Sequence, residues 1–293
     1  MTTVADRPAA STEGARRARP TRRPKTGQQL RSISGLSLGV VVLWLTLLVL
    51  LPLIAVVGKS FDYGWSGFTA AVTNNEAAAA LRLTIGLSAI VAVVNAIMGV
   101  VVGWVLVRER FPGARVFEMV IDIPFALPTV VAGVVMLYLY GGDSPVGINL
   151  SGARVGLFVV LLFVTLPFTV RTVQPVLLRL DREAEQAAAS LGASPVAVFR
   201  RIVLPQLLPA VASGATLAFA RAIGEYGSLV FISGNIQFKT EIASSLIYGK
   251  LQNNDTPQLA EQQASAIAAL LLVVSAIVLV ALDLVQRRVA RRG

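Results

Sequence analysis

Apolar residues along this chain gather into six long runs that are separated by shorter polar connections. The runs cover residues 36–57, 83–107, 116–140, 155–173, 207–233 and 263–284. An α-helix needs ~20 apolar residues to cross the hydrocarbon core of a membrane, and each run approaches or exceeds that length. The composition agrees, since 55% of the residues are apolar and the mean hydropathy is +0.71. The pattern predicts an all-α, polytopic membrane protein with six transmembrane helices.

The lysines and arginines outside these runs predict how the protein is oriented in the membrane. Nineteen of them lie in the N-terminal tail, the connections after the second and fourth runs, and the C-terminal tail. The alternate connections carry only four, Lys59, Arg154, Lys239 and Lys250, apart from Arg82 at the edge of the second run. Short loops rich in lysine and arginine remain in the cytoplasm. We therefore expect a multi-pass protein of the cell (plasma or inner) membrane, with both termini and the connection after the fourth run in the cytoplasm.

The two ends of the chain are predicted to be tails. Residues 1–35 are basic and lack apolar periodicity, so we expect a disordered cytoplasmic tail that touches membrane lipid. Nucleic acid binding is not expected, because no folded module accompanies the basic residues. The run at 36–57 is too long for a cleaved signal peptide and is predicted to be the first transmembrane helix. Residues 286–293 form a second, short cytoplasmic tail.

Several kinds of chemistry are excluded by residues that the chain lacks. It contains no cysteine and no histidine, which leaves no thiolate, no zinc-protease motif and no Ser-His-Asp triad. The G-x-x-x-x-G-K-[ST] pattern of ATP-binding loops is also absent. We therefore expect no catalytic residue, no metal site and no cofactor in this chain. An ATPase that drives it would be a separate polypeptide.

The polar connection between the fourth and fifth runs predicts a hairpin of two short helices. Asp181 is suited to cap the first helix, and the alanines that follow favour helix formation. Gly192 supplies a left-handed residue that ends this helix. Ser194 and Pro195 start the second helix as its N-cap and first helical residue, and Pro205 is expected to end it. Such a compact polar hairpin in a membrane protein is suited to being held by another protein.

This connection resembles the cytoplasmic EAA loop of ABC-importer permeases, which reads Glu-Ala-Ala, three residues, Gly, nine residues, Ile-x-Leu-Pro. The residues that correspond are Gln186, Ala187, Ala188, Gly192, Ile202, Leu204 and Pro205, with Ser194 and Pro195 between them. One position departs from the pattern, because Gln186 replaces the family's glutamate while Glu185 lies one residue earlier. The resemblance implies that this loop couples the chain to ATPase subunits.

Three polar residues within the fifth run lie at helical spacing. Arg221 is near the middle of the run, Glu225 follows four residues later, and Ser228 extends the same face. A charge at the centre of a membrane costs ~2.5–3.5 kcal/mol on insertion scales, so we expect these residues to have a structural or functional role. Two interpretations stay open. The Arg–Glu pair either fastens this helix to its neighbours, or it belongs to a polar face that lines the path of an anion.

Other unusual residues in the runs are interpreted as structural. Asn95 is expected to hydrogen-bond a neighbouring helix, and Arg171 is expected to reach toward the membrane surface along its own aliphatic stem. Glycines in the second and third runs, including Gly86, Gly99 and Gly133, are expected to allow close contact between helices.

Longer segments resemble the sulfate/thiosulfate permeases of type I ABC importers, specifically the T-type subunit. They are residues 166–176, 217–228 and 231–235, together with residues 121–133, which resemble molybdate permeases as well. The resemblance implies a MetI-like, type I ABC importer permease fold. Its core would cover residues 78–285 and include a coupling loop at 174–206. It also implies that the chain translocates sulfate or thiosulfate as the permease subunit of an ATP-driven importer.

The same resemblance implies a set of partners. They are a sister permease subunit that completes a heterodimer, two ATPase subunits that bind ATP and Mg, and an extracytoplasmic sulfate-binding protein. Two alternatives stay open, a molybdate or tungstate importer permease and an anion transporter that works without an ATPase.

Overall fold

The computed structural model describes residues 29–252 and 255–290, and this described part is helical with no strand. The elements in chain order are α1 (Gln29–Leu45), the π-helical turn η1 (Thr46–Leu50), α2 (Leu51–Ser60), α3 (Gly64–Thr73), α4 (Asn75–Arg108), α5 (Ala114–Ala126), α6 (Thr129–Tyr140), α7 (Arg154–Arg179), α8 (Arg182–Ser190), α9 (Pro195–Val198), the π-helical turn η2 (Phe199–Val203), α10 (Leu204–Ile223), α11 (Val230–Ser233), α12 (Ala243–Leu251) and α13 (Pro257–Ala290). The chain forms two compact units, residues 1–52 and 53–293. The all-α prediction is confirmed.

Within the described residues, five helical segments are long and apolar enough to cross a membrane. They are Ser37–Ser60, Asn75–Arg108, Arg154–Arg179, Pro195–Ile223 and Pro257–Ala281. Each coincides with a predicted run, although the bounds differ. The first helix begins at Gln29, inside the predicted tail 1–35, and the rest of that tail lies outside the described residues. The last helix continues to Ala290, into the predicted tail 286–293.

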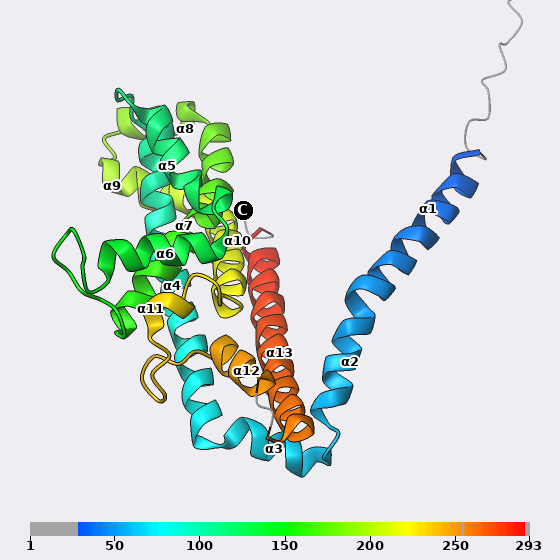
Figure 1. The fold of residues 1–293 in the computed structure, drawn as a ribbon. Coiled ribbons are helices and arrows are strands. Elements are labelled where there is room, and N and C mark those ends of the chain that lie inside the picture. The colour runs from blue at the N-terminus through cyan, green and yellow to red at the C-terminus, as the bar shows by residue number, and fades with distance from the viewer. Residues whose placement is uncertain (1–28, 253–254, 291–293) are drawn as a thin grey trace, which may run out of the picture. The chain divides into compact units, whose positions relative to one another are not determined.

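The third predicted span, 116–140, is not one straight helix. It consists of α5 and α6, whose axes are bent by 117° at a short break. The break falls at Leu127, which has extended backbone angles and precedes Pro128. A residue before proline is disfavoured in the α conformation, so the chain leaves the helix at this point. Figure 1 shows α6 lying across the bundle, whereas α5 runs along it.

The contacts between α4 and α7 show that these two helices are parallel, so the segment between them must cross the bundle in the opposite direction. Asn95 donates a hydrogen bond from Nδ2 to Oγ1 of Thr165 at 2.7 Å, which confirms its predicted contact with a neighbouring helix. Further along, Gly99 lies against Thr169 in α7. Because residue numbers rise together along both helices, α4 and α7 run in the same direction. The segment 109–153 must therefore return across the bundle, and the broken α5–α6 pair with its following loop provides that crossing.

Small residues allow three helices to meet closely in the middle of the second unit. A Cβ atom on Gly99 would overlap the side chain of Thr169, and one on Gly214 of α10 would lie 2.7 Å from Cα of Thr169. Glycine is the only residue that permits both approaches. Close packing of this kind is how helices associate where lipid offers no hydrophobic driving force.

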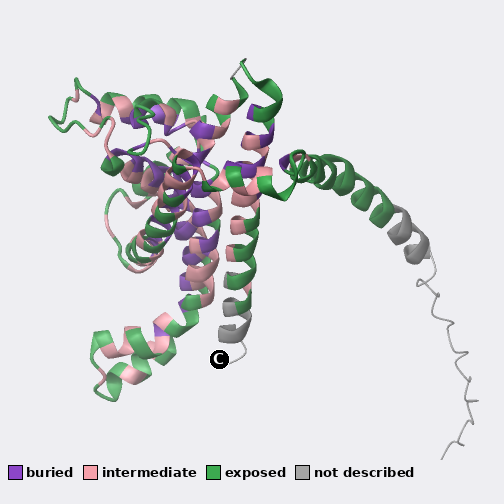
Figure 2. Ribbon diagram, turned by 90° about the horizontal axis from the view of Figure 1, so that it is seen from below, coloured by how far each residue is buried: buried purple, intermediate pink, exposed green. Residues whose placement is uncertain are grey.

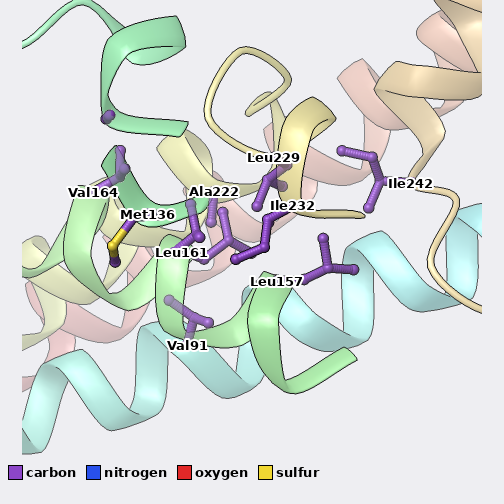
Figure 3. Close-up of a cluster of buried hydrophobic side chains, with 11 residues drawn as sticks. Val91, Met136, Leu157, Leu161, Val164, Ala222, Leu229, Ile232 and Ile242 are labelled. Carbon is purple, nitrogen blue, oxygen red and sulfur yellow. The ribbon is translucent and has the colours of Figure 1, made fainter. Parts of the chain in front are cut away.

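The main apolar core joins α4, α6, α7 and α10 to α11 and the segment after it. Figure 3 shows Val91, Leu157 and Leu161 pointing toward Leu229 and Ile232. All of these side chains are almost completely buried. Figure 2 shows buried residues where helices of the second unit meet and exposed residues on their outward faces. The core therefore holds the α10–α11 connection, which carries Glu225 and Ser228, against α7.

Candidate functional site

The predicted hairpin is present as α8, a tight turn, and α9, which we call the knob (residues 181–203). Oδ1 of Asp181 accepts a hydrogen bond from the Glu183 amide at 2.8 Å, as expected of a cap. Gly192 has φ +86°, the left-handed conformation in which a side chain is strained. Oγ of Ser194 accepts from the Ala197 amide at 3.3 Å, and Pro195 lies in the first turn of α9. The capping predictions are confirmed.

The expectation that Pro205 ends the second helix of the knob is wrong. The chain remains helical from Pro195 to Ile223, a stretch of 29 residues. The wider π-helical turn η2 precedes the proline, and the Leu204 amide donates to the Phe199 carbonyl across it. Pro205 lies in the first turn of α10, where its missing N–H and its ring are tolerated. The knob is therefore continuous with the span that follows it.

An ion pair fastens the knob to the end of α4. Arg108 and Glu185 form this pair, and their side chains are only 9% and 19% exposed. The guanidinium of Arg108 also lies over the ring of Trp104, 5.5 Å from its centroid. Trp104 in turn meets Phe199 edge to face, with ring centroids 5.5 Å apart. Glu185, not the neighbouring Gln186, thus carries the charge that holds the knob.

The outer surface of the knob is open and partly apolar. Leu191 at the turn is 89% exposed, and Val196 on α9 is 67% exposed. Arg200 and Arg201 line a cavity of about 390 Å³ beside Val196. Of the other predicted loop residues, Gln186, Ala187, Ser194, Pro195 and Pro205 are exposed, and Ala188, Ile202 and Leu204 are partly buried. Exposed apolar side chains next to cationic ones are suited to a protein partner.

The second predicted site consists of Arg221, Glu225 and Ser228. These residues do lie together, but they do not share one helical face as predicted. The helix α10 ends at Ile223, so the span predicted at 207–233 is shorter and Glu225 lies in the turn beyond it. Arg221 and Glu225 still form an ion pair, with side chains 32% and 1% exposed. Oε1 of Glu225 accepts hydrogen bonds from the amide and the Oγ of Ser228, both at 2.9 Å. The three residues form one cluster.

Neighbouring elements hold this cluster in ways that the sequence did not indicate. Oγ of Ser244 in α12 donates to the Glu225 carbonyl at 2.8 Å. A Cβ atom on Gly133 of α6 would lie 2.7 Å from the Ser228 carbonyl oxygen, so α6 touches the backbone of the turn. Gly133, the glycine of the third run, was the available signal for this contact. The bent helix α6 is thereby connected to the Arg221–Glu225 pair.

A further polar network joins α5 to α7. Arg171 pairs with Asp122, and its Nη1 donates to Oε1 of Gln174 at 2.8 Å. Nε2 of Gln174 donates to Oε1 of Glu118 at 2.8 Å. The sequence predicted only that Arg171 reaches toward the membrane surface, and the structure adds a carboxylate partner, because the broken span places Asp122 beside it. Sequence spacing alone did not relate these residues.

Neither site gathers the side chains that a metal ion requires. Among the described residues, acidic side chains do not gather in groups of three or more that could hold a metal ion. What the two sites offer instead is a surface for a protein and a guanidinium that is partly exposed while its carboxylate partner is buried.

These features define the class, a multi-pass helical membrane protein with a polar knob between two of its spans. Residues 95–292 match the family described as "Binding-protein-dependent transport system inner membrane component". The chain belongs to this family.

Its relatives and structural neighbours agree with that membership. The sulfate transport system permease protein CysT of Salmonella typhimurium is 39% identical over 88% of this chain and 94% of that protein. The protein of the same name from Synechocystis is 42% identical over 85% of this chain and 87% of that protein. A bacterial ABC transporter that imports the acidic polysaccharide alginate has a TM-score of 0.73 at 14% identity, covering 89% of this chain and 96% of its own. The MetNI methionine ABC transporter has a TM-score of 0.53 at 21% identity, covering 74% and 99%. The fold is thus the predicted MetI-like one.

Proposed function

We propose that this chain is the membrane-spanning permease subunit of an ATP-driven importer and that it translocates sulfate or thiosulfate into the cell. The observation that carries the proposal is identity of about 40% to named sulfate permeases over most of both chains, 39% in one case and 42% in another. The fully formed knob adds support from the structure, because a transporter that works without an ATPase has no obvious use for it.

The proposed assembly contains four further chains. A sister permease subunit completes the pathway, two ATPase subunits bind ATP and Mg, and an extracytoplasmic sulfate-binding protein delivers the anion. The knob is the surface offered to an ATPase, since Leu191 and Val196 are exposed at its tip. We place the chain in the cell membrane. The distribution of lysine and arginine favours a cytoplasmic position for the knob and for both termini.

Movement of the knob has a direct mechanical route to the Arg221 cluster. The helix Pro195–Ile223 contains 29 residues. At ~1.5 Å per residue it is roughly 43 Å long, with the knob at one end and Arg221 in the last turn at the other. The Arg108–Glu185 pair makes the knob move together with α4. A rigid displacement of the knob by the ATPase would therefore tilt α10, which is the kind of two-state movement that alternating access requires.

In this proposal Arg221 provides a weak contact for the anion. Its guanidinium is partly exposed, whereas Glu225 is buried and also held by Ser228. Glu225 fixes the position of Arg221 and balances much of its charge. An arginine has five N–H donors, so some remain for an oxyanion. Partial neutralisation keeps such binding weak, which favours release into the cell over retention.

Uptake of radiolabelled sulfate tests the proposed function. In a strain that lacks this chain, reintroducing it should restore uptake, and unlabelled thiosulfate should compete more strongly than molybdate. Stronger competition by molybdate would instead favour the molybdate or tungstate importer. Uptake that persists after inactivation of the ATPase subunits would favour the ATPase-independent transporter.

A pair of variants tests the role of Arg221 in the same assay. Arg221→Gln is expected to lower sulfate uptake while the complex still assembles, and Arg221→Lys should retain more of it because the charge remains. Arg110→Gln is the matched control, since Arg110 is exposed two residues beyond the end of α4. Uptake by Arg221→Gln equal to that of the control would assign Arg221 to packing alone.

A further inference from the structure

A cavity of about 550 Å³ lies along the first half of α4, at the end of the bundle opposite the knob. Six of its lining residues come from α4 and are spaced alternately by three positions and by one, which places them on one face of the helix. They are Ala79, Arg82, Leu83, Gly86, Leu87 and Ile90. Arg154, at the start of α7, and Phe238 close the cavity from the other side.

The two arginines of this cavity are not neutralised by carboxylates within the described residues. Two other basic residues at this end, Lys59 and Lys250, do form ion pairs with acidic side chains. Arg154 donates only to backbone carbonyls, from Nε to Lys239 at 2.9 Å and from Nη2 to Phe238 at 3.4 Å. Arg82 is exposed and makes no hydrogen bond or ion pair with the described residues. The guanidinium groups of Arg82 and Arg154 are therefore available to bind an anion.

The rest of the lining is hydrocarbon, and it forms an open groove. A Cβ atom on Gly86 would meet nothing within 4 Å, so the predicted close helix contact at this glycine is wrong. Gly86 instead leaves a depression between Leu83, Leu87 and Ile90. Beyond Ile90 the same side of α4 remains apolar and exposed at Val93, Ile97 and Val101. The groove thus opens onto a long apolar surface.

We propose that this cavity binds an anionic phospholipid from the membrane leaflet opposite the knob. Arg82 lies seven residues after the start of α4, ~10 Å along the helix, and Ile90 lies ~12 Å deeper. The phosphate is held by Arg82 and Arg154, because a planar guanidinium matches phosphate oxygens in pairs. The acyl chains occupy the groove at Gly86 and continue over the apolar surface below it.

The lining favours a lipid over a free oxyanion such as the transported one. Six of the eight lining residues are apolar, and they would remain in contact with water beside a small hydrated anion. A phospholipid covers them and places its charge at the arginines at the same time. The lipid site requires only that the chain lies in a membrane. The proposal of this site therefore does not depend on which ion is transported.

Native mass spectrometry of the full complex tests this site. The complex is reconstituted in phosphatidylcholine nanodiscs with increasing amounts of phosphatidylglycerol, and the number of phosphatidylglycerol molecules that it retains is counted. A cation near an anionic membrane surface contributes ~1 kcal/mol, so Arg82→Gln is expected to weaken retention about fivefold. Arg82→Lys should stay near the wild-type protein because it keeps the charge.

Two further variants separate the groove from general surface charge. Gly86→Phe places a ring in the open depression, where an added Cβ atom meets nothing within 4 Å, and it is expected to reduce retention even though both arginines remain. Lys239→Gln is the matched control, because it removes an exposed charge from the same end without lining the cavity. Equal retention in Arg82→Gln and the wild-type protein would overturn the proposal, as would an equal loss in Lys239→Gln. Displacement of phosphatidylglycerol by inorganic phosphate alone would show a site for the free anion and would overturn it too.

Discussion

Replacing Glu185 by glutamine is expected to loosen the knob from the end of α4. Arg108, the ionic partner of Glu185, is 9% exposed and would keep its charge without a carboxylate. Removing one member of a fully buried ion pair costs ~3–5 kcal/mol. Water reaches this pair in part, since Glu185 is 19% exposed, and screening by solvent lowers the cost. We therefore expect ~1–3 kcal/mol for the knob of this protein.

That energy has consequences that two assays can measure. A change of ~1–3 kcal/mol shifts the ratio of fastened to loosened knob by about fivefold to 150-fold. Amides of α8 in the assembled complex should exchange with deuterium faster in Glu185→Gln by a factor in that range. Sulfate uptake per ATP hydrolysed should fall as well, because a loosened knob no longer moves rigidly with α4. ATP hydrolysis itself should be retained, since the ATPase subunits are unchanged.

Matched variants show whether the ion pair is the cause. Arg108→Lys keeps the charge and is expected to lose less protection than Arg108→Gln. Arg110→Gln removes a neighbouring exposed arginine and should behave as the wild-type protein does. A double variant of Arg108 and Glu185 should cost less than the sum of the single ones, because the two side chains interact. Unchanged exchange and coupling in Glu185→Gln would refute the role given to this pair.

Three further predictions concern single residues. Gly192→Ala places a side chain at φ +86°, which should cost ~1–2 kcal/mol, and Gly192→Asp should in addition lower uptake relative to stimulated ATPase activity. Gly99→Leu should lower the melting temperature of the purified chain by overpacking worth ~1–3 kcal/mol, whereas Gly249→Leu, in open space on α12, should leave it nearly unchanged. Burial raises the pKa of Glu241, so the folded chain holds this proton more tightly than the unfolded chain and gains stability as the pH falls through that raised pKa. Glu241→Gln should remove this gain, and melting curves across acidic to neutral pH check it.

Local features of the knob could be predicted because their causes are local. A cap such as Asp181 acts on amides two or three residues away, and Gly192 is recognised from the conformation that its position requires. Pro205 was misjudged because its effect depends on the turn before it. The π-helical turn at Phe199–Val203 absorbs the proline, and no simple residue pattern announces such a turn.

Contacts between distant segments could not be predicted in the same way. Arg108 and Glu185 are 77 positions apart in the sequence. From the sequence, Arg108 contributed only to the predicted orientation in the membrane, and its contact with the knob is visible only in the fold. The break at Leu127 had a local signal in Pro128, but the apolar run continues through it and hides the change of direction. The Arg221–Glu225 pair was predicted from helical spacing, yet it forms across the end of α10.

The central claim is that the knob lies in the cytoplasm and is held by an ATPase subunit. The chain contains no cysteine, so Leu191→Cys introduces a single thiol at the exposed tip of the knob. A thiol-reactive cross-linker should join this cysteine to the ATPase subunit, and a membrane-impermeant maleimide should label it only after the cells are opened. Labelling in intact cells, or a tip that joins no ATPase subunit, would contradict the account.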